Sequence, residues 1–233
     1  ADKLPSSVLD LQYWRLTLPY SGEGKEPLEV DQPALADFQD PECFFVNDKG
    51  DGVVFRAHCT DVSTRNSDYP RCELREMAAA PTAKRMAWNT TDETVHTMVV
   101  VEAITAVPPV KQHVVSAQIH AEDDDLLMVR LEEDELFLER NNLDEVALEN
   151  DYVLGTPFEI KFEACKGHVK VWYNGELRLD WEVDSEGCYF KAGCYTQSNP
   201  DKGDKPESYG EVVLYKLTVS HGQTPAMKPR GGK

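Results

Sequence analysis

The stretch HVKVWYNGELRLDW at residues 168–181 decides the fold class of this chain. Apolar and polar side chains alternate on both sides of Asn174 and Gly175, as they do in strands that bury one face. An Asn-Gly pair between two such runs is the strongest short-range signal for a β-hairpin. We therefore predict two antiparallel strands over 168–173 and 176–181, joined by a tight turn.

The same pattern continues in both directions along the chain. Helical periodicity is weak, and we expect short helices only at 8–11 and 33–38. Many short strands separated by Pro, Gly and Asn-Asp turns predict an all-β sandwich, jelly roll or barrel. No repeat or linker divides the chain, so we expect residues 1–233 to form a single domain. The further predicted strands are 53–57, 71–76, 97–104, 114–120, 126–131, 136–139, 158–162, 189–197 and 211–220.

The charge balance is strongly acidic. The chain has 24 basic and 42 acidic side chains, a formal net charge of −18, which disfavours nucleic acid and anionic membranes as partners. No stretch approaches the ~18 consecutive apolar residues of a membrane span. A site for an anion must therefore be a local basic patch. The acidic runs 123–125 and 132–135 are expected to be solvated turns rather than a calcium site, and 222–233 a loosely held tail.

The cysteines have no zinc-like spacing. We expect buried thiols with one or more disulfides, which an oxidising, extracellular location would allow, although the spacing leaves the pairing open. The six cysteines are Cys43, Cys59, Cys72, Cys165, Cys188 and Cys194.

Three predicted strands carry polar side chains on one face and apolar ones on the other. Each strand alone suits a structural role as well, such as an ion-pair ladder, a hydrogen-bonded histidine or an exposed sheet face. In one sheet, however, they would build a basic, hydrogen-bonding floor. The polar faces hold Arg71, Glu73 and Arg75 in the first strand, Gln118 and His120 in the second, and Lys191, Gly193, Tyr195 and Gln197 in the third.

These three segments resemble, in the same order, the signature segments of polysaccharide lyase family 7, the alginate lyases. They read RCELR at 71–75, QIH at 118–120 and YFKAGCYTQ at 189–197, and WRLTLP at 14–19 is similar to the start of that family. The resemblance runs from about Trp14 to about Val219. It implies a β-jelly roll of two antiparallel sheets with a catalytic cleft on the concave face, and a secreted enzyme that needs no metal or cofactor.

The family reaction removes the C5 proton of a uronate and expels the sugar linked through O4, which leaves a C4–C5 double bond. By resemblance, Arg75 and Gln118 neutralise the uronate carboxylate, and Arg71 on the same face is an assisting residue. An arginine suits this task because its planar fork binds a carboxylate through two hydrogen bonds. Arg71, Glu73, Lys191 and Gln197 are assigned to substrate binding.

His120 and Tyr195 match the acid and base of the family. We expect Arg75 and Lys191 to lower the pKa of Tyr195, which is ordinarily about 10. In our hypothesis Tyr195 protonates the leaving O4, and His120 takes the proton from guluronate, whereas Tyr195 does both on mannuronate. In the family, isoleucine at the position of Ile119 goes with a preference for guluronate-containing blocks. We expect an endo-acting monomer.

Three alternatives remain open. The first is a lyase of another polyuronate, such as glucuronan. The second is a glycoside hydrolase, which needs two carboxylates across a sugar, for which Glu73 and Glu211 are candidates. The third is a non-catalytic carbohydrate-binding module, since a fold does not set a function. Such a module needs exposed aromatic side chains, whereas we expect Trp172 and Trp181 to lie in the core.

Overall fold

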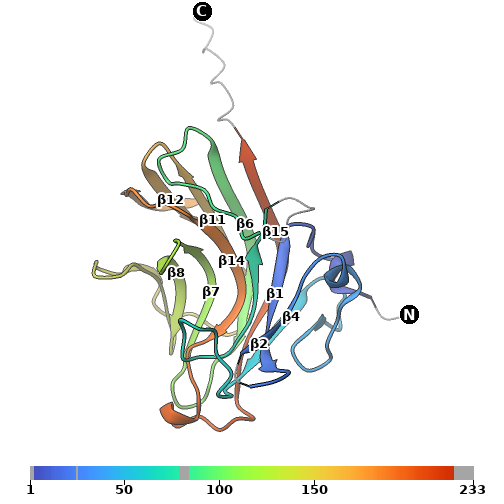
Figure 1. The fold of residues 1–233 in the computed structure, drawn as a ribbon. Coiled ribbons are helices and arrows are strands. Elements are labelled where there is room, and N and C mark those ends of the chain that lie inside the picture. Colours follow the sequence, from blue (N-terminus) through green and yellow to red (C-terminus); the bar gives the residue numbers. More distant parts are fainter. Residues whose placement is uncertain (1–2, 25, 79–83, 223–233) are drawn as a thin grey trace, which may run out of the picture.

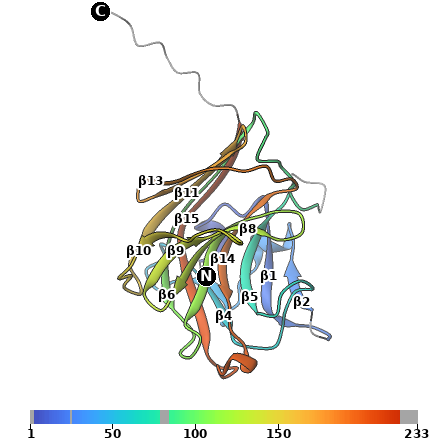
Figure 2. The same cartoon turned by 90° about the vertical axis from the view of Figure 1, so that its left-hand side faces the viewer.

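Because most strands carry apolar side chains on one face, they assemble into two antiparallel sheets that stack through those faces (Figures 1 and 2). The structure, a computed structural model, describes residues 3–24, 26–78 and 84–222. Its regular elements are strands and three short 3₁₀ helices at Pro5–Ser7, Ala34–Asp37 and Pro200–Lys202. The two-sheet jelly roll confirms the predicted all-β fold class.

One sheet has eight strands and the other has seven. The first has the order β10-β9-β8-β7-β14-β5-β1-β2, formed in that order by Val146–Glu149, Glu135–Glu139, Asp125–Glu132, His113–His120, Tyr189–Thr196, Arg71–Glu76, Trp14–Ser21 and Pro27–Val30. The second has the order β13-β12-β11-β6-β15-β4-β3, formed by Glu176–Glu182, His168–Tyr173, Phe158–Cys165, Val95–Ala106, Tyr209–Gly222, Val53–His58 and Phe44–Val46.

The core lies between the sheets. Four fully buried phenylalanines, Phe44, Phe55, Phe162 and Phe190, are among its largest side chains. Burying an aromatic side chain of this size contributes roughly 2–3 kcal/mol. The inner faces of both sheets are thereby used up, so a binding site can only form on an outer face or at an end of the sandwich.

The hairpin that set the fold class is confirmed. Asn174 and Gly175 both have positive φ, 49° and 81°, as a two-residue turn between twisted strands requires. The predicted strands are all present, whereas β1 and the short strands β2, β3 and β10 were missed. The expected helix at 8–11 is wrong, because Leu9 and Leu11 are both buried and the helical turn comes earlier, at Pro5–Ser7.

The expected disulfides are not confirmed. All six cysteines are free thiols, and all but Cys165 are buried. Cys72 and Cys194 lie opposite each other on β5 and β14 with their side chains in the apolar interior, and Cys72 Sγ donates to the carbonyl oxygen of Cys43 at 3.2 Å. Burial raises the pKa of Cys194 to about 12. These thiols therefore act as small core side chains.

The acidic stretch 123–150 extends the eight-stranded sheet beyond β7 as β8, β9 and β10 (Figure 2). The run 132–135 is the hairpin turn that we expected. The run 123–125 is only partly a solvated turn, because Asp125 begins β8 and is half-buried, and burial raises its pKa to about 6. Of the expected loose tail, residues 223–233 lie outside the described residues.

Candidate active site

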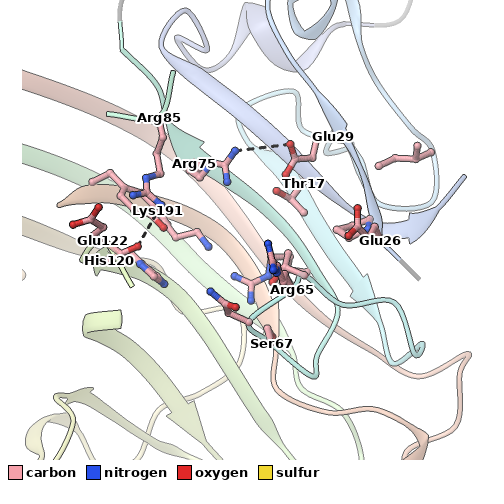
Figure 3. Close-up of a pocket in the computed structure, with 16 residues that line it drawn as sticks. Thr17, Glu26, Glu29, Arg65, Ser67, Arg75, Arg85, His120, Glu122 and Lys191 are labelled. Atoms are coloured by element: carbon pink, nitrogen blue, oxygen red, sulfur yellow. Dashed lines mark hydrogen bonds and ion pairs between the residues drawn. The ribbon is translucent and has the colours of Figure 1, made fainter. Parts of the chain in front are cut away.

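Three adjacent strands, β5, β14 and β7, form the floor of a cleft on the outer face of the eight-stranded sheet (Figure 3). The backbone register places Lys191 of β14 opposite Arg75 on one side and Gln118 on the other. Tyr195 lies opposite Arg71, and Tyr189 lies opposite His120. The predicted polar faces of the three strands therefore do meet in one sheet.

The cleft has a volume of about 520 Å³, within the usual size of a ligand pocket. Its basic lining residues are Arg65, Arg71, Arg75, Arg85 and Lys191, and its acidic ones are Glu26, Glu29 and Glu122. The acidic protein thus contains the local basic patch that binding of an anion requires.

Glu73 is the centre of a buried polar cluster beneath the cleft, here called the Glu73 cluster, formed by Glu73, Arg71, Lys191 and Gln118. The Glu73 carboxylate is 1% exposed and accepts from Arg71 Nη1 at 2.8 Å, Lys191 Nζ at 2.7 Å and Gln118 Nε2 at 2.7 Å. Burial alone would raise its pKa, but Lys191 and Arg71 outweigh burial and lower it to about 2. We expected Glu73 to bind substrate. Instead, it accepts hydrogen bonds from the donors of Arg71, Lys191 and Gln118 and holds them in place.

Gly193 allows the two strands to approach each other at this cluster. It lies opposite Glu73 with φ of 136°, and a Cβ there would come within 2.7 Å of the Cys72 carbonyl oxygen and 2.9 Å of Glu73 Cα. A side chain at this position would therefore push β14 away from β5. The sequence suggested that a ligand approaches the backbone at this glycine. In the structure it is the neighbouring strand β5 that comes close.

The charges of the cluster depend on one another. Burial and Arg71 lower the pKa of Lys191 to about 8, although Glu73 opposes them. Arg71 keeps a raised pKa because Glu73 and Tyr195 offset its burial, and its buried Nε has no hydrogen-bond partner among the described residues. The cluster therefore holds one buried guanidinium N–H that donates to no partner among these residues.

Tyr195 lies against Arg71. The guanidinium carbon of Arg71 is 4.0 Å from the centre of the Tyr195 ring, and the phenolic oxygen is 2.9 Å from Ser67 Oγ. Burial raises the pKa of Tyr195, while Arg71 and Ser67 act in the opposite direction. The expectation that Arg75 and Lys191 lower this pKa is wrong, since burial dominates and the cation in contact is Arg71.

His120 lies at the other end of the cluster. Its ring stacks on Tyr189 with the centroids 5.0 Å apart, and its Nδ1 lies 2.6 Å from the carbonyl oxygen of Ala121. A carbonyl can only accept, so Nδ1 carries the proton and Nε2 keeps a free lone pair. Burial and Lys191 lower the pKa of His120 to about 4. The imidazole is therefore neutral at pH 7 and can act as a base through Nε2.

Arg75 lies outside the Glu73 cluster. Its recorded ion pair, with Glu29, spans 3.8 Å, and its buried Nε has no hydrogen-bond partner in the described part of the chain. Arg85 lies beside it, with its guanidinium 4.5 Å from the centre of the Tyr189 ring (Figure 3). These two arginines extend the basic floor away from Tyr195.

Glu73, Gln118 and Tyr195 do not themselves line the cleft but contact the lining residues Arg71 and Lys191 or their cluster, whereas Gln197 is left apart from both. It follows the end of β14, does not line the cleft, and its Oε1 has no hydrogen-bond partner among the described residues. Sequence reasoning missed Arg65, Ser67 and Arg85, since two come from a loop and the third from a segment without strand periodicity. Nothing in their local sequence marks them as part of a cleft.

The carboxylates proposed for a hydrolase do not face each other. Glu211 lies on β15 in the seven-stranded sheet, where it accepts from Arg56 Nε at 2.7 Å, whereas Glu73 belongs to the other sheet. The tryptophans do not line the cleft either. Trp181 packs against the core as expected, but Trp172 is only half-buried and lies under the ammonium group of Lys161, 4.8 Å from its ring centre.

Comparison with known proteins gives consistent matches. The model of the alginate lyase family matches residues 9–221. The chain is 48% identical to alginate lyase AlgAT5 from polysaccharide lyase family 7 over 94% of this chain and 99% of that one, with a TM-score of 0.90. It is 44% identical to the alginate lyase from Corynebacterium sp. over 95% and 99% of the two chains, with a TM-score of 0.88. A family 7 alginate lyase, A1-II′, in complex with product (GGG), is 25% identical over 94% and 99%, with a TM-score of 0.79.

Proposed function

The chain belongs to the alginate lyases, a family of polysaccharide lyases, and we propose that it cleaves the 4-O-glycosidic bond of alginate by β-elimination at this cleft. The observation that carries the proposal is the Glu73 cluster, with His120 at one end and Tyr195 at the other. A neutral base, a protonated phenol and a buried donor set are what removal of a proton next to a carboxylate needs.

Arg71 and Gln118 are the residues that we propose to neutralise the substrate carboxylate. Both are held by Glu73, Arg71 lines the cleft, and the Nε of Arg71 and the second N–H of Gln118 are not used by Glu73. Neutralisation matters because removal of the C5 proton adds negative charge next to an anion. This proposal moves the role that the resemblance gave to Arg75 onto Arg71, since Arg71 contacts Tyr195.

His120 takes the C5 proton of guluronate through Nε2, and Tyr195 gives its proton to O4 of the departing sugar. Because its pKa is raised, Tyr195 is protonated at neutral pH and suits the acid role. Acting as base on mannuronate would cost Tyr195 more for the same reason. The arrangement therefore supports guluronate-containing blocks as the preferred substrate. Ile119 is fully buried in the core and cannot contact a substrate.

We further propose endo-cleavage by a secreted monomer. The cleft floor is formed by β7, β14 and β5, with further strands on both sides, so a polymer can extend past the cleft in both directions. Endo-cleavage predicts a rapid fall in the viscosity of alginate and products of several sugars at early times. Monosaccharides or dimers released from the start would contradict it. Sedimentation of the purified protein tests the monomer, and the location of the protein in cultures of its source tests secretion.

The test of the reaction follows the ultraviolet absorbance of the new C4–C5 double bond on polyguluronate, polymannuronate and glucuronan. We expect a rise that is fastest on polyguluronate and lost in Tyr195→Phe. Reducing ends without absorbance would indicate hydrolysis, and binding without either signal a carbohydrate-binding module. A faster rise on glucuronan would assign another polyuronate.

A matched pair of variants tests the choice of arginine. Lysine keeps the charge but not the bidentate fork. We expect Arg71→Lys to lower kcat about a hundredfold, as loss of one preorganised donor does, and Arg75→Lys mainly to raise KM. The reverse pattern would return the neutralising role to Arg75.

A further inference from the structure

Ser67 is the only hydrogen-bond partner of the Tyr195 phenolic oxygen among the described residues, at 2.9 Å. It belongs to the loop of residues 64–67, which forms one wall of the cleft (Figure 3). The loop is fixed by a hydrogen bond from the Ser67 backbone N–H to the Thr64 carbonyl oxygen at 3.0 Å. The serine hydroxyl is therefore held in place beside a proposed catalytic group.

The hydrogen bonds of Ser67 limit where its proton can point. The backbone N–H of Tyr69 donates to Ser67 Oγ at 3.2 Å, which uses one lone pair of the hydroxyl. The single hydroxyl proton then has two acceptors, the Tyr195 oxygen at 2.9 Å and the Tyr69 carbonyl oxygen at 3.4 Å. Either hydroxyl of the Ser67–Tyr195 pair can donate, and donation from Ser67 uses the shorter of its two contacts. When Ser67 donates, the proton of Tyr195 itself is not used by Ser67 and is available to another acceptor.

We propose that Ser67 is a positioning residue, which donates a hydrogen bond to the Tyr195 phenolic oxygen throughout the catalytic cycle. The inference rests on the proposed lyase function. It assigns two effects to one hydroxyl. Before the reaction it directs the phenol proton toward O4, and after the transfer it stabilises the phenolate.

The proton balance of the step shows where this hydrogen bond matters. His120 takes the C5 proton, the electron pair of that bond forms the C4–C5 double bond, the C4–O4 bond breaks, and O4 takes the proton of Tyr195. The phenolate that remains lies against Arg71 and accepts from Ser67. His120 then releases its proton to solvent and Tyr195 regains one from solvent. A hydrogen bond to a charged acceptor is stronger than one to a neutral acceptor, so Ser67 favours the product of the transfer.

The variant Ser67→Ala tests the proposal, with Ser67→Thr as the conservative control that keeps the hydroxyl. We expect Ser67→Ala to lower kcat on polyguluronate about tenfold to a hundredfold with little change in KM. We also expect the pKa of Tyr195 to rise in this variant. Tyrosine-labelled NMR measures that pKa without substrate, and Tyr195→Phe assigns the signal. Ser67→Thr should restore both values.

The two readouts separate the possible failures. An unchanged Tyr195 pKa overturns the proposal, even if kcat falls, because the serine would then only shape the loop. An unchanged kcat with a raised pKa also overturns it, because the hydrogen bond would not serve the reaction. If Tyr195→Phe keeps full activity, the proposed acid role of Tyr195 is wrong, and the NMR titration still shows whether the hydrogen bond exists.

Discussion

Glu73→Gln is the substitution for which the structure gives the sharpest expectation. The change keeps the shape of the side chain but removes the only carboxylate that accepts from Arg71, Lys191 and Gln118 in the described structure. An amide presents one acceptor oxygen and one donor NH₂ in place of two acceptors. If the oxygen stays with the two cations, the NH₂ group meets the NH₂ group of Gln118. Gln118 must then rotate its amide away from its present orientation.

The magnitude follows from the pKa of Glu73. Its value of about 2, against 4.5 for an ordinary glutamate, means that ionised Glu73 stabilises the folded protein by roughly 3 kcal/mol at pH 7. Loss of one partner from a buried ion pair costs about 3–5 kcal/mol in other proteins. We therefore expect Glu73→Gln to lower the free energy of unfolding by roughly 3 kcal/mol at pH 7, and kcat by more than a hundredfold.

Urea denaturation from pH 7 down to pH 2 provides the assay. Because the pKa of Glu73 is lowered by folding, its stabilisation is present above the unfolded pKa and is lost as the pH falls through about 4.5 toward 2. The gap between wild type and Glu73→Gln should therefore narrow on acidification. The control is Glu211→Gln, whose partly exposed ion pair with Arg56 is worth less than about 1 kcal/mol. A gap below 1 kcal/mol at pH 7, or one that does not change with pH, would refute the reasoning.

Two further predictions concern buried groups of the core. Burial raises the pKa of Glu102 to about 8, so the free energy of unfolding of the wild type falls between about pH 4.5 and pH 8. The variant Glu102→Gln has no charge to bury. In denaturant titrations it should therefore become more stable than the wild type over this window, by up to ~5 kcal/mol. Three hydrogen bonds link Asp92, His96, His221 and Glu76 in a chain, whereas two neutral imidazoles supply only two protons. Glu76→Gln supplies the third proton from its amide, so at pH 7 its melting temperature should be at least that of the wild type.

The architecture was predictable because alternation at period two is a local property of each strand. The residue types of 71–76, 118–120 and 189–197 showed which side chains share a face, and their meeting in one sheet bears this out. The short strands β2, β3 and β10 were missed because three or four residues do not show a period. The strand β1 was missed because residues 16–19 are buried on both faces and do not alternate. The cysteines were misread because a buried thiol on an inner face leaves the same sequence pattern as half of a disulfide.

The roles within the site were less predictable. Arg71 and Arg75 share a face, and only the register between β5 and β14 places Arg71 beside Tyr195. In the sequence, Glu73 looks like a ligand-binding carboxylate. Its three donors come from its own strand and from two other strands far along the chain, so no local pattern shows that it is already paired. The sign of the pKa shift of Tyr195 depends on the balance between burial and charge, which alternation does not contain.

An acidic protein that binds a polyanion needs its cations in one place and needs them charged. The screening length in physiological salt is about 8 Å, so distant acidic side chains weaken the attraction of the cleft only slightly. Keeping Lys191 charged is more difficult, since burial and the nearby Arg71 already lower its pKa to about 8. A second buried cation without a counter-charge would lower it further. Glu73 beneath both cations removes that conflict, and Arg71 and Lys191 still line the cleft. The one buried carboxylate of this cluster is thus what keeps the cleft basic at neutral pH.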